Sequence, residues 1–254
     1  MIFAAGIGSR LKPFTLHHPK ALAEVAGKPV LQHAMEHLHD NAGISRMVVN
    51  VHHFADQIIS FLKVSPYAGD IDVSVSDESE RLLDTGGGLL AALPLLETNI
   101  GTYDDIVVLH NADIVTDVDI SSIINELITT DADAVLLMSH RDSSRHLWFD
   151  KNSRLVGWEN VNTHSLKPCS FIPDMGLHKF GAFGGIHAIR LSRLAPHLRE
   201  YGLIYGNVFS LIPFYLAIIG KADIRAYFPE GKYHWFDIGT PDKLAACNKS
   251  FIPR

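Results

Sequence analysis

The sequence predicts an α/β fold in which a doubly wound, mostly parallel sheet is flanked by helices. Two observations predict it. Over the first 140 residues, segments with the apolar pattern of strands alternate with segments whose apolar residues recur every three or four positions, as in helices. A glycine-rich loop also follows the first apolar segment directly. In open α/β sheets, ligands bind beyond the carboxyl ends of the strands, so this loop is the first place to look for a site.

The elements follow from these patterns in chain order. We expect strands at residues 1–5, 47–51, 71–75, 106–110, 134–139, 180–189 and 224–227. We expect helices at residues 30–41, 55–62, 88–96, 120–128 and 210–220, and a last helix that Thr240 caps, with Pro241 in its first turn. Residues 140–180 are rich in Ser, His, Asn and Pro and predict loops or short strands. No repeat or linker is visible, so residues 1–254 are predicted to form a single domain.

Composition limits the classes of function. Hydrophobic residues make up 47% and charged residues 20% of 254 residues, which allows a sizeable core. The net charge of -6 argues against an extended nucleic-acid surface, which would need a basic excess. The two cysteines, Cys169 and Cys247, form no CxxC pair and fit a reducing compartment. No apolar run reaches the length of a membrane span. A cytoplasmic protein with neither nucleic-acid nor membrane partners is expected.

The loop after the first strand has the chemistry of an anion site. Glycines let backbone N–H groups approach a phosphate closely, and an arginine adds a charge-assisted fork. A dinucleotide-binding GxGxxG is excluded because Leu11 stands where the third glycine is needed, and no Gly-Lys-Ser/Thr follows to make a Walker A loop. The candidate anion-binding residues here are Ala5, Gly6, Gly8, Ser9 and Arg10.

The longer pattern carries a resemblance. Gly6-x-Gly8-x-Arg10-x-x-Pro13-x-Thr15-x-x-x-Pro19-Lys20 resembles the signature of the sugar-1-phosphate nucleotidyltransferases. Three later segments fit the same family in the same order, and they are Leu83-Asp-Thr-Gly-Gly-Gly88, His110-Asn-Ala-Asp113 and His234-Trp-Phe-Asp-Ile-Gly-Thr-Pro241. The resemblance spans nearly the whole chain and is strongest to compact members, the N-acetylmuramate-1-phosphate uridylyltransferases and mannose-1-phosphate guanylyltransferases. It implies a Rossmann-like fold.

The resemblance also implies roles for individual residues. Arg10 and Lys20 would be catalytic. The loop residues Ala5, Gly6, Gly8, Ser9 and Arg10 would bind the nucleotide, and Thr85, Gly86 and Gly87 would contact its base or ribose from a turn. The sugar phosphate would meet Lys20, Asn111, Glu159 and Gly185, and Asp113 and Asp237 would be the metal ligands. Two carboxylates, completed by phosphate oxygens and water, suit Mg²⁺.

The implied partners are a nucleoside triphosphate, UTP first, and a sugar-1-phosphate, bound by the N-terminal and C-terminal halves respectively. A monomer or a weak homodimer is expected.

Some positions depart from the family pattern. Ala112 replaces the usual glycine of the metal motif, and Asn160 follows Glu159 where relatives have the lysine that holds the sugar phosphate. The first strand also lacks the family's lysine-led start, so a chain start several residues upstream is expected.

Two alternatives stay open. A cytidylyltransferase of an amino-alcohol phosphate would need an aromatic cage for its cation, which Trp148, Trp158 and Trp235 could supply if they converged. A nucleotide-binding protein without catalysis would explain the departures. Zinc catalysis and Ser-His-Asp hydrolysis are not supported, because the sequence has neither HExxH nor GxSxG.

Overall fold

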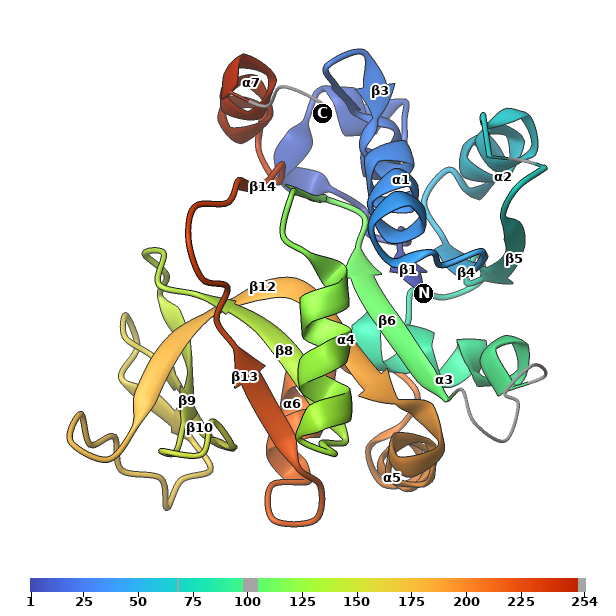
Figure 1. Ribbon diagram of the computed structural model, residues 1–254. Helices are drawn as coiled ribbons and strands as arrows, with labels where there is room; N and C mark the ends of the chain where they lie inside the picture. The colour runs from blue at the N-terminus through green and yellow to red at the C-terminus, as the bar shows by residue number, and fades with distance from the viewer. Residues whose placement is uncertain (68, 98–104, 251–254) are drawn as a thin grey trace.

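The computed structural model describes residues 1–67, 69–97 and 105–250, and a ten-stranded sheet runs through it with helices on both faces (Figure 1). Four strands form its parallel part in the order β6-β1-β4-β5, and they are β1 (Ile2–Phe3), β4 (Arg46–Val51), β5 (Asp72–Asp77) and β6 (Ile106–Asn111). This arrangement confirms the predicted fold class. The first strand is shorter than expected, because residues 4–8 leave the sheet as a loop.

The second half of the chain joins the same sheet through one long strand. This strand, β12 (Lys179–Arg190), runs antiparallel to β6, to β8 (Ala134–Ser139) and to β9 (Arg145–Phe149). The short strands β10 (Leu155–Asn160) and β11 (Ser165–Lys167) extend the sheet beyond β9, and β13 (Ile224–Tyr227) pairs in parallel with β8. The region 140–180 is therefore built of short strands joined by polar turns.

The helices cover both faces, as a doubly wound sheet requires. One apolar cluster joins the sheet to α1 (Val30–Ala42), α2 (Ala55–Val64) and α4 (Ile120–Thr129). A second cluster joins the opposite face to α3 (Asp84–Glu97), α5 (Leu191–Tyr205) and α6 (Leu211–Ala217). The helix α5 was missing from the sequence-based set. Its buried residues Leu191, Leu194, Ala195 and Leu198 do have helical spacing, but Pro196 and several charged residues obscured it.

The start of α3 corrects the predicted helix 88–96. The helix begins at Asp84 and takes in Gly86, Gly87 and Gly88, although glycine disfavours helix interiors. The reason is tertiary packing. A β-carbon at Gly87 would lie 2.0 Å from the carbonyl oxygen of Asn207, and one at Gly86 would lie 2.4 Å from the Phe209 ring. The glycines therefore let the segment before α6 pack against the helix backbone.

A small two-stranded sheet stands at the carboxyl end of the parallel strands. It pairs β7 (Ile114–Thr116) with β14 (Trp235–Asp237), and α7 (Pro241–Ser250) follows at once. A third apolar cluster, which includes Leu11, Val25, Val115, Ile238 and Cys247, packs these elements against the hairpin of β2 (Glu24–Val25) and β3 (Lys28–Pro29). The helix α7 is thereby held beside the loop that follows the first strand (Figure 1).

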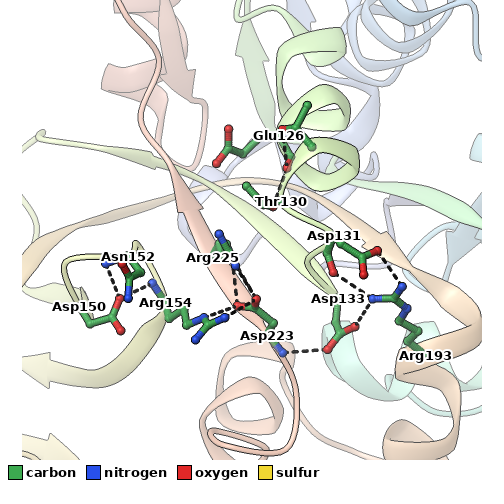
Figure 2. Close-up of polar contacts among 11 residues, drawn as sticks. Glu126, Thr130, Asp131, Asp133, Asp150, Asn152, Arg154, Arg193, Asp223 and Arg225 are labelled. Carbon is green, nitrogen blue, oxygen red and sulfur yellow. Dashed lines mark hydrogen bonds and ion pairs between the residues drawn. The ribbon is translucent and has the colours of Figure 1, made fainter.

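Far from this end, an acid–base cluster ties together β13, the β9–β10 turn and the start of β8 (Figure 2). Asp223 accepts hydrogen bonds from Arg225 Nη2 at 2.7 Å and from Arg154 Nη2 at 3.3 Å. The backbone N–H of Asp223 donates to Asp133 Oδ2 at 2.8 Å. Burial opposes the ionisation of Asp223, but the hydrogen bonds and charges of Arg225 and Arg154 bring its pKa below the ordinary value.

We expect Asp223→Asn to lower the free energy of unfolding by about 1–3 kcal/mol at neutral pH, since two charged donors lose their acceptor charge. The pKa of Asp223 is lowered in the folded state, so its contribution is present above the unfolded-state pKa of about 4 and is lost as the pH falls through the folded-state value. Urea denaturation at neutral pH and at progressively lower pH measures this. The difference between the two proteins should shrink on acidification, whereas Asp56→Asn, at an exposed position in α2, should stay within about 0.5 kcal/mol of the parent.

Candidate active site

A pocket of about 290 Å³ opens at the carboxyl ends of β1 and β6. Residues from five separate stretches of the chain line it. They are Phe3, Ala4, Gly6, Gly8, Ser9, Arg10, Lys20, Ala21, Thr85, Asn111, Ala112, Asp113 and Gly239. This is the position at which a parallel α/β sheet binds its ligand. The fold thus brings most of the predicted site residues together.

The loop between β1 and β2 is wound into three short 3₁₀ turns, and Gly8 makes this winding possible. Gly8 has a φ of 65°, in the left-handed region. A β-carbon there would lie 2.9 Å from side-chain carbons of both Thr15 and Lys20. The Thr15 hydroxyl donates to the Gly8 carbonyl at 2.9 Å and closes the loop. The glycine therefore allows Lys20 to lie against the first turn.

The first turn of the loop offers donors to an anion. The backbone N–H groups of Gly6, Ile7 and Gly8 have no acceptor among the residues that the structure describes. Arg10 lines the same pocket, and a β-carbon at Gly239 would lie 3.2 Å from its Nη2 atom. Free N–H groups beside a guanidinium are the recognition elements of a phosphate site.

Lys20 and Asp113 form an ion pair inside the pocket, between Nζ and Oδ2. The lysine side chain is 12% exposed and the aspartate side chain 30%. Lys20 is thus a largely buried cation in the pocket wall, and the loop places it opposite the end of β6. The sequence had associated these two residues only through separate motifs, 93 positions apart.

Asp237 is the last residue of β14, the strand that pairs with β7, and Asp113 lies just before β7. In the β7–β14 pair, Asp237 is opposite Ile114, and the Ile238 N–H donates to the Asp113 carbonyl at 3.1 Å. The Asp237 carboxylate accepts from Lys243 Nζ at 2.7 Å and from the Gly239 N–H at 2.8 Å. Burial raises the pKa of Asp237, but the bond from Lys243 and the charges of Lys243 and Lys20 outweigh it, so the net pKa is lowered. Asp237 is therefore ionised at neutral pH.

Three residues of the predicted nucleotide set do not line the pocket. Ala5 is buried beside the lining residues Ala4 and Gly6. The N–H groups of Gly86 and Gly87 both donate to the Phe209 carbonyl, at 2.8 and 3.0 Å. These two glycines are occupied in packing, so the idea that their backbone reads a base from an open turn needs correction. Thr85, just before them, does line the pocket.

The predicted sugar-phosphate residues divide in the same way. Asn111 lines the pocket, and a β-carbon at Gly185 would approach its amide nitrogen to 3.1 Å, so Gly185 lies just behind it. Glu159 lies on β10 and accepts a hydrogen bond from the Trp148 indole at 3.1 Å. It lines neither the pocket nor the neighbouring groove described below. Glu159 lies on a hairpin and binds the buried Trp148 ring, which indicates a structural role.

The three tryptophans do not form an aromatic cage. Trp148 packs against Phe171 and Phe180, Trp158 lies under Lys167, and Trp235 lies under Arg141. Each indole therefore has a different set of partners. This arrangement removes the feature that would have favoured a quaternary ammonium substrate.

A series of buried hydrogen bonds supports the pocket residue Ala4. The sequence alone gave no reason to single out its members. Asn50 Oδ1 accepts from the Ala4 N–H at 2.8 Å, and Asn50 Nδ2 donates to Glu78 Oε1 at 2.7 Å. Glu78 Oε2 accepts from the Leu83 N–H at 3.1 Å. Burial raises the pKa of Glu78, against the effect of these hydrogen bonds. These hydrogen bonds fix the end of β1 relative to the start of α3.

Comparison with known proteins gives the family. Residues 1–147, more than half of the chain, match the family model for nucleotidyl transferases. An N-acetylmuramate alpha-1-phosphate uridylyltransferase of Neisseria meningitidis serogroup B is 32% identical over 248 residues, which cover 96% of this chain and 94% of that protein. The chain therefore belongs to the nucleotidyl transferase family.

Further similarities point the same way. The protein of the same name from Caulobacter vibrioides is 43% identical over 97 residues, 38% of this chain and 40% of that protein. The mannose-1-phosphate guanylyltransferase catalytic subunit beta of Drosophila melanogaster is 33% identical over 46% of this chain and 30% of its own length. The crystal structure of HddC from Yersinia pseudotuberculosis shares the fold, with a TM-score of 0.70, 22% identity and coverage of 99% and 98%. The predicted resemblance to sugar-1-phosphate nucleotidyltransferases and the predicted enzyme class are confirmed.

Proposed function

We propose that this protein transfers a nucleotidyl group from a nucleoside triphosphate, UTP first, to a sugar-1-phosphate and releases pyrophosphate. The observation that carries the proposal is the pocket that gathers free N–H groups, Arg10, Lys20 and Asp113 at the carboxyl edge of the sheet. Two relatives that are named uridylyltransferases support the substrates. We treat residues 1–254 as one unit, with the nucleotide in the N-terminal half and the sugar phosphate toward the C-terminal half.

The reaction needs charge neutralisation more than proton transfer. An oxygen of the sugar phosphate forms a bond to the α-phosphorus, the bond from that phosphorus to the bridging oxygen breaks, and pyrophosphate leaves with the electron pair. The nucleophile is already ionised, so no general base is required. The barrier comes from bringing two anions together, and positioning with electrostatic stabilisation supplies most of the catalysis in such transfers.

The residues divide this task. The N–H groups of Gly6 and Gly8, with Arg10, hold the β- and γ-phosphates that leave as pyrophosphate. Lys20, held in the pocket wall by the loop, lies between the donor and acceptor phosphates and compensates the charge of both. Its pairing with Asp113 keeps the ammonium in place before substrates arrive.

The donor set also fits a divalent cation. Asp113 lies in the turn just before β7, and Asp237 lies on β14 opposite Ile114, the first residue of β7. Mg²⁺ is typically held by one or two carboxylates plus substrate phosphates and water. Among the described residues, no group of three or more His, Cys, Asp or Glu side chains could hold a metal, so substrate oxygens would complete the coordination. When bound there, Mg²⁺ would polarise the α-phosphate and neutralise part of its charge.

The compartment is part of the proposal. Cys169 is exposed and Cys247 is buried, and both are free thiols, which supports a reducing compartment such as the cytoplasm. None of the helices within the described ranges is long and apolar enough to cross a bilayer. We expect a monomer or a weak homodimer, which light scattering on the purified protein measures.

The substrate prediction is tested by pyrophosphate release. Four nucleoside triphosphates are assayed with Mg²⁺ against a panel of sugar-1-phosphates that includes N-acetylmuramate 1-phosphate. We expect the highest kcat/KM with UTP, weaker use of other pyrimidine nucleotides and weaker use still of GTP. The preference rests on the named relatives, because Gly86 and Gly87 are engaged in packing.

Isothermal titration of each triphosphate separates binding from turnover. Tighter binding and faster use of GTP or ATP than of UTP would contradict the predicted preference for UTP. Absence of pyrophosphate release with every pair of triphosphate and sugar-1-phosphate would contradict the proposed nucleotidyl transfer.

A further inference from the structure

One cation near the pocket has no carboxylate partner. Arg141 follows β8, and among the described residues it forms no ion pair. Its Nη2 atom donates to the Phe183 carbonyl at 2.6 Å, and its guanidinium carbon lies 4.3 Å from the centre of the Trp235 ring. Its Nε atom is buried and has no hydrogen-bond partner among those residues. Burial lowers the pKa of Arg141, although an arginine stays charged at neutral pH.

The surroundings hold this guanidinium against Trp235, on the strand that carries Asp237. Trp235 lies two residues before Asp237, and its indole N–H donates to the Gly184 carbonyl at 2.8 Å. The negative charge of Asp237 acts on Arg141 and partly offsets the effect of burial on its pKa. Arg141 is thus fixed between β12 and β14 by its contacts with Phe183 and Trp235.

Arg141 also lines a separate groove of about 660 Å³. The other lining groups are mostly polar and come from the segment after β8, from the start of β9 and from the turn after β10. They include His140, Ser144, His146 and Asn162, with the ring of Phe180. Hydroxyl, amide and imidazole groups beside an aromatic ring are suited to a hydroxylated sugar. Arg141 is thus both a wall residue of this groove and a neighbour of Trp235, which lies on the same strand as Asp237.

We infer that Arg141 binds the phosphate of the acceptor sugar-1-phosphate, with the sugar in the groove. The inference rests on the proposed function and extends it to a residue outside the family motifs. A buried N–H without an acceptor is costly, and a phosphate dianion would supply acceptors in the planar geometry that a guanidinium matches.

The test separates acceptor binding from donor binding. In Arg141→Met and Arg141→Lys, the KM for the sugar-1-phosphate that the parent uses best is measured, together with the Kd for UTP by calorimetry. We expect the KM to rise about tenfold or more in the methionine variant and less in the lysine variant, which keeps the charge but not the fork. The Kd for UTP should stay within about twofold. Arg154→Met is the matched control, because it removes the same charge from the distant cluster (Figure 2).

Calorimetry with the sugar-1-phosphate and with the same sugar lacking the phosphate gives a second readout. We expect the methionine variant to lose affinity for the phosphorylated sugar only. Unchanged acceptor affinity, or an equal loss for UTP and acceptor, would overturn the inference and leave Arg141 as a support for Trp235. A parent that binds sugar-1-phosphates without releasing pyrophosphate would contradict the proposed function, and the calorimetric comparison would still decide the role of Arg141. A parent that binds none of them would overturn both.

Discussion

Lys20→Met is expected to lower kcat/KM by about 10³-fold, the upper end of what loss of one preorganised electrostatic contact costs. Lys20 is the ammonium in the pocket wall, 12% exposed and paired with Asp113. Methionine keeps most of the apolar stem and removes only the charge. The donor and acceptor phosphates would then approach each other with their repulsion uncompensated. Steady-state pyrophosphate release under saturating Mg²⁺ measures the effect.

Folding has to be monitored in the same variant. If Lys20 were solvated, its replacement would leave the unfolding midpoint nearly unchanged. Because Lys20 is largely buried and paired with Asp113, we expect the free energy of unfolding to fall by about 1–3 kcal/mol. Lys63→Met, on the exposed side of α2, should retain parent activity and stability. Full activity in Lys20→Met would remove Lys20 from the mechanism.

The second large effect is expected at the two aspartates. Asp113→Asn and Asp237→Asn should each lower turnover by about 100-fold or more and raise the Mg²⁺ concentration needed for half-maximal activity. An amide keeps the size and one acceptor oxygen of the carboxylate but has no charge to hold a divalent cation. Removal of metal by chelation should abolish activity in the parent, and added Mg²⁺ should restore it.

A binding measurement distinguishes a metal role from a general loss of structure. With Mg²⁺ present, the parent should bind UTP more tightly than without it, and this difference should shrink in both variants. Asp72→Asn, at a largely exposed position on β5, is the matched control and should behave as the parent does. Equal Mg²⁺ dependence in parent and variants would contradict the assignment of these aspartates as ligands.

Local sequence was sufficient to single out the loop after the first strand and to predict most of the helices. The Gly6–Gly8–Arg10 pattern follows a strand, and the chemistry of a glycine-rich anion loop depends on neighbouring residues, so it is readable from their order. The helix α1 also begins at Val30 and ends before Gly43, which has a φ of 63°. Apolar periodicity and a terminal glycine are local signals, and they specify such a helix without tertiary information.

The three glycines after Thr85 show where local reasoning fails. Their sequence predicts a turn, because glycine disfavours helices. In the structure all three belong to α3. The N–H groups of Gly86 and Gly87 donate to the Phe209 carbonyl, and the absence of side chains at these two positions makes room for residues 207–209. A contact between residues more than a hundred positions apart has no local signature, so the propensity was overridden by packing.

By itself, the sequence determined the α/β class, the loop after the first strand, and the identity of Lys20, Asp113 and Asp237 as residues to examine. Only the tertiary structure decided that Lys20 pairs with Asp113, that Glu159 lies away from the pocket, and that Arg141 lines the groove and packs over Trp235. A sequence motif shows which residue types occur at fixed spacings along the chain. The electrostatics of a site depend instead on distances through space, and those are set by how β12, β14 and the loop fold onto one sheet edge.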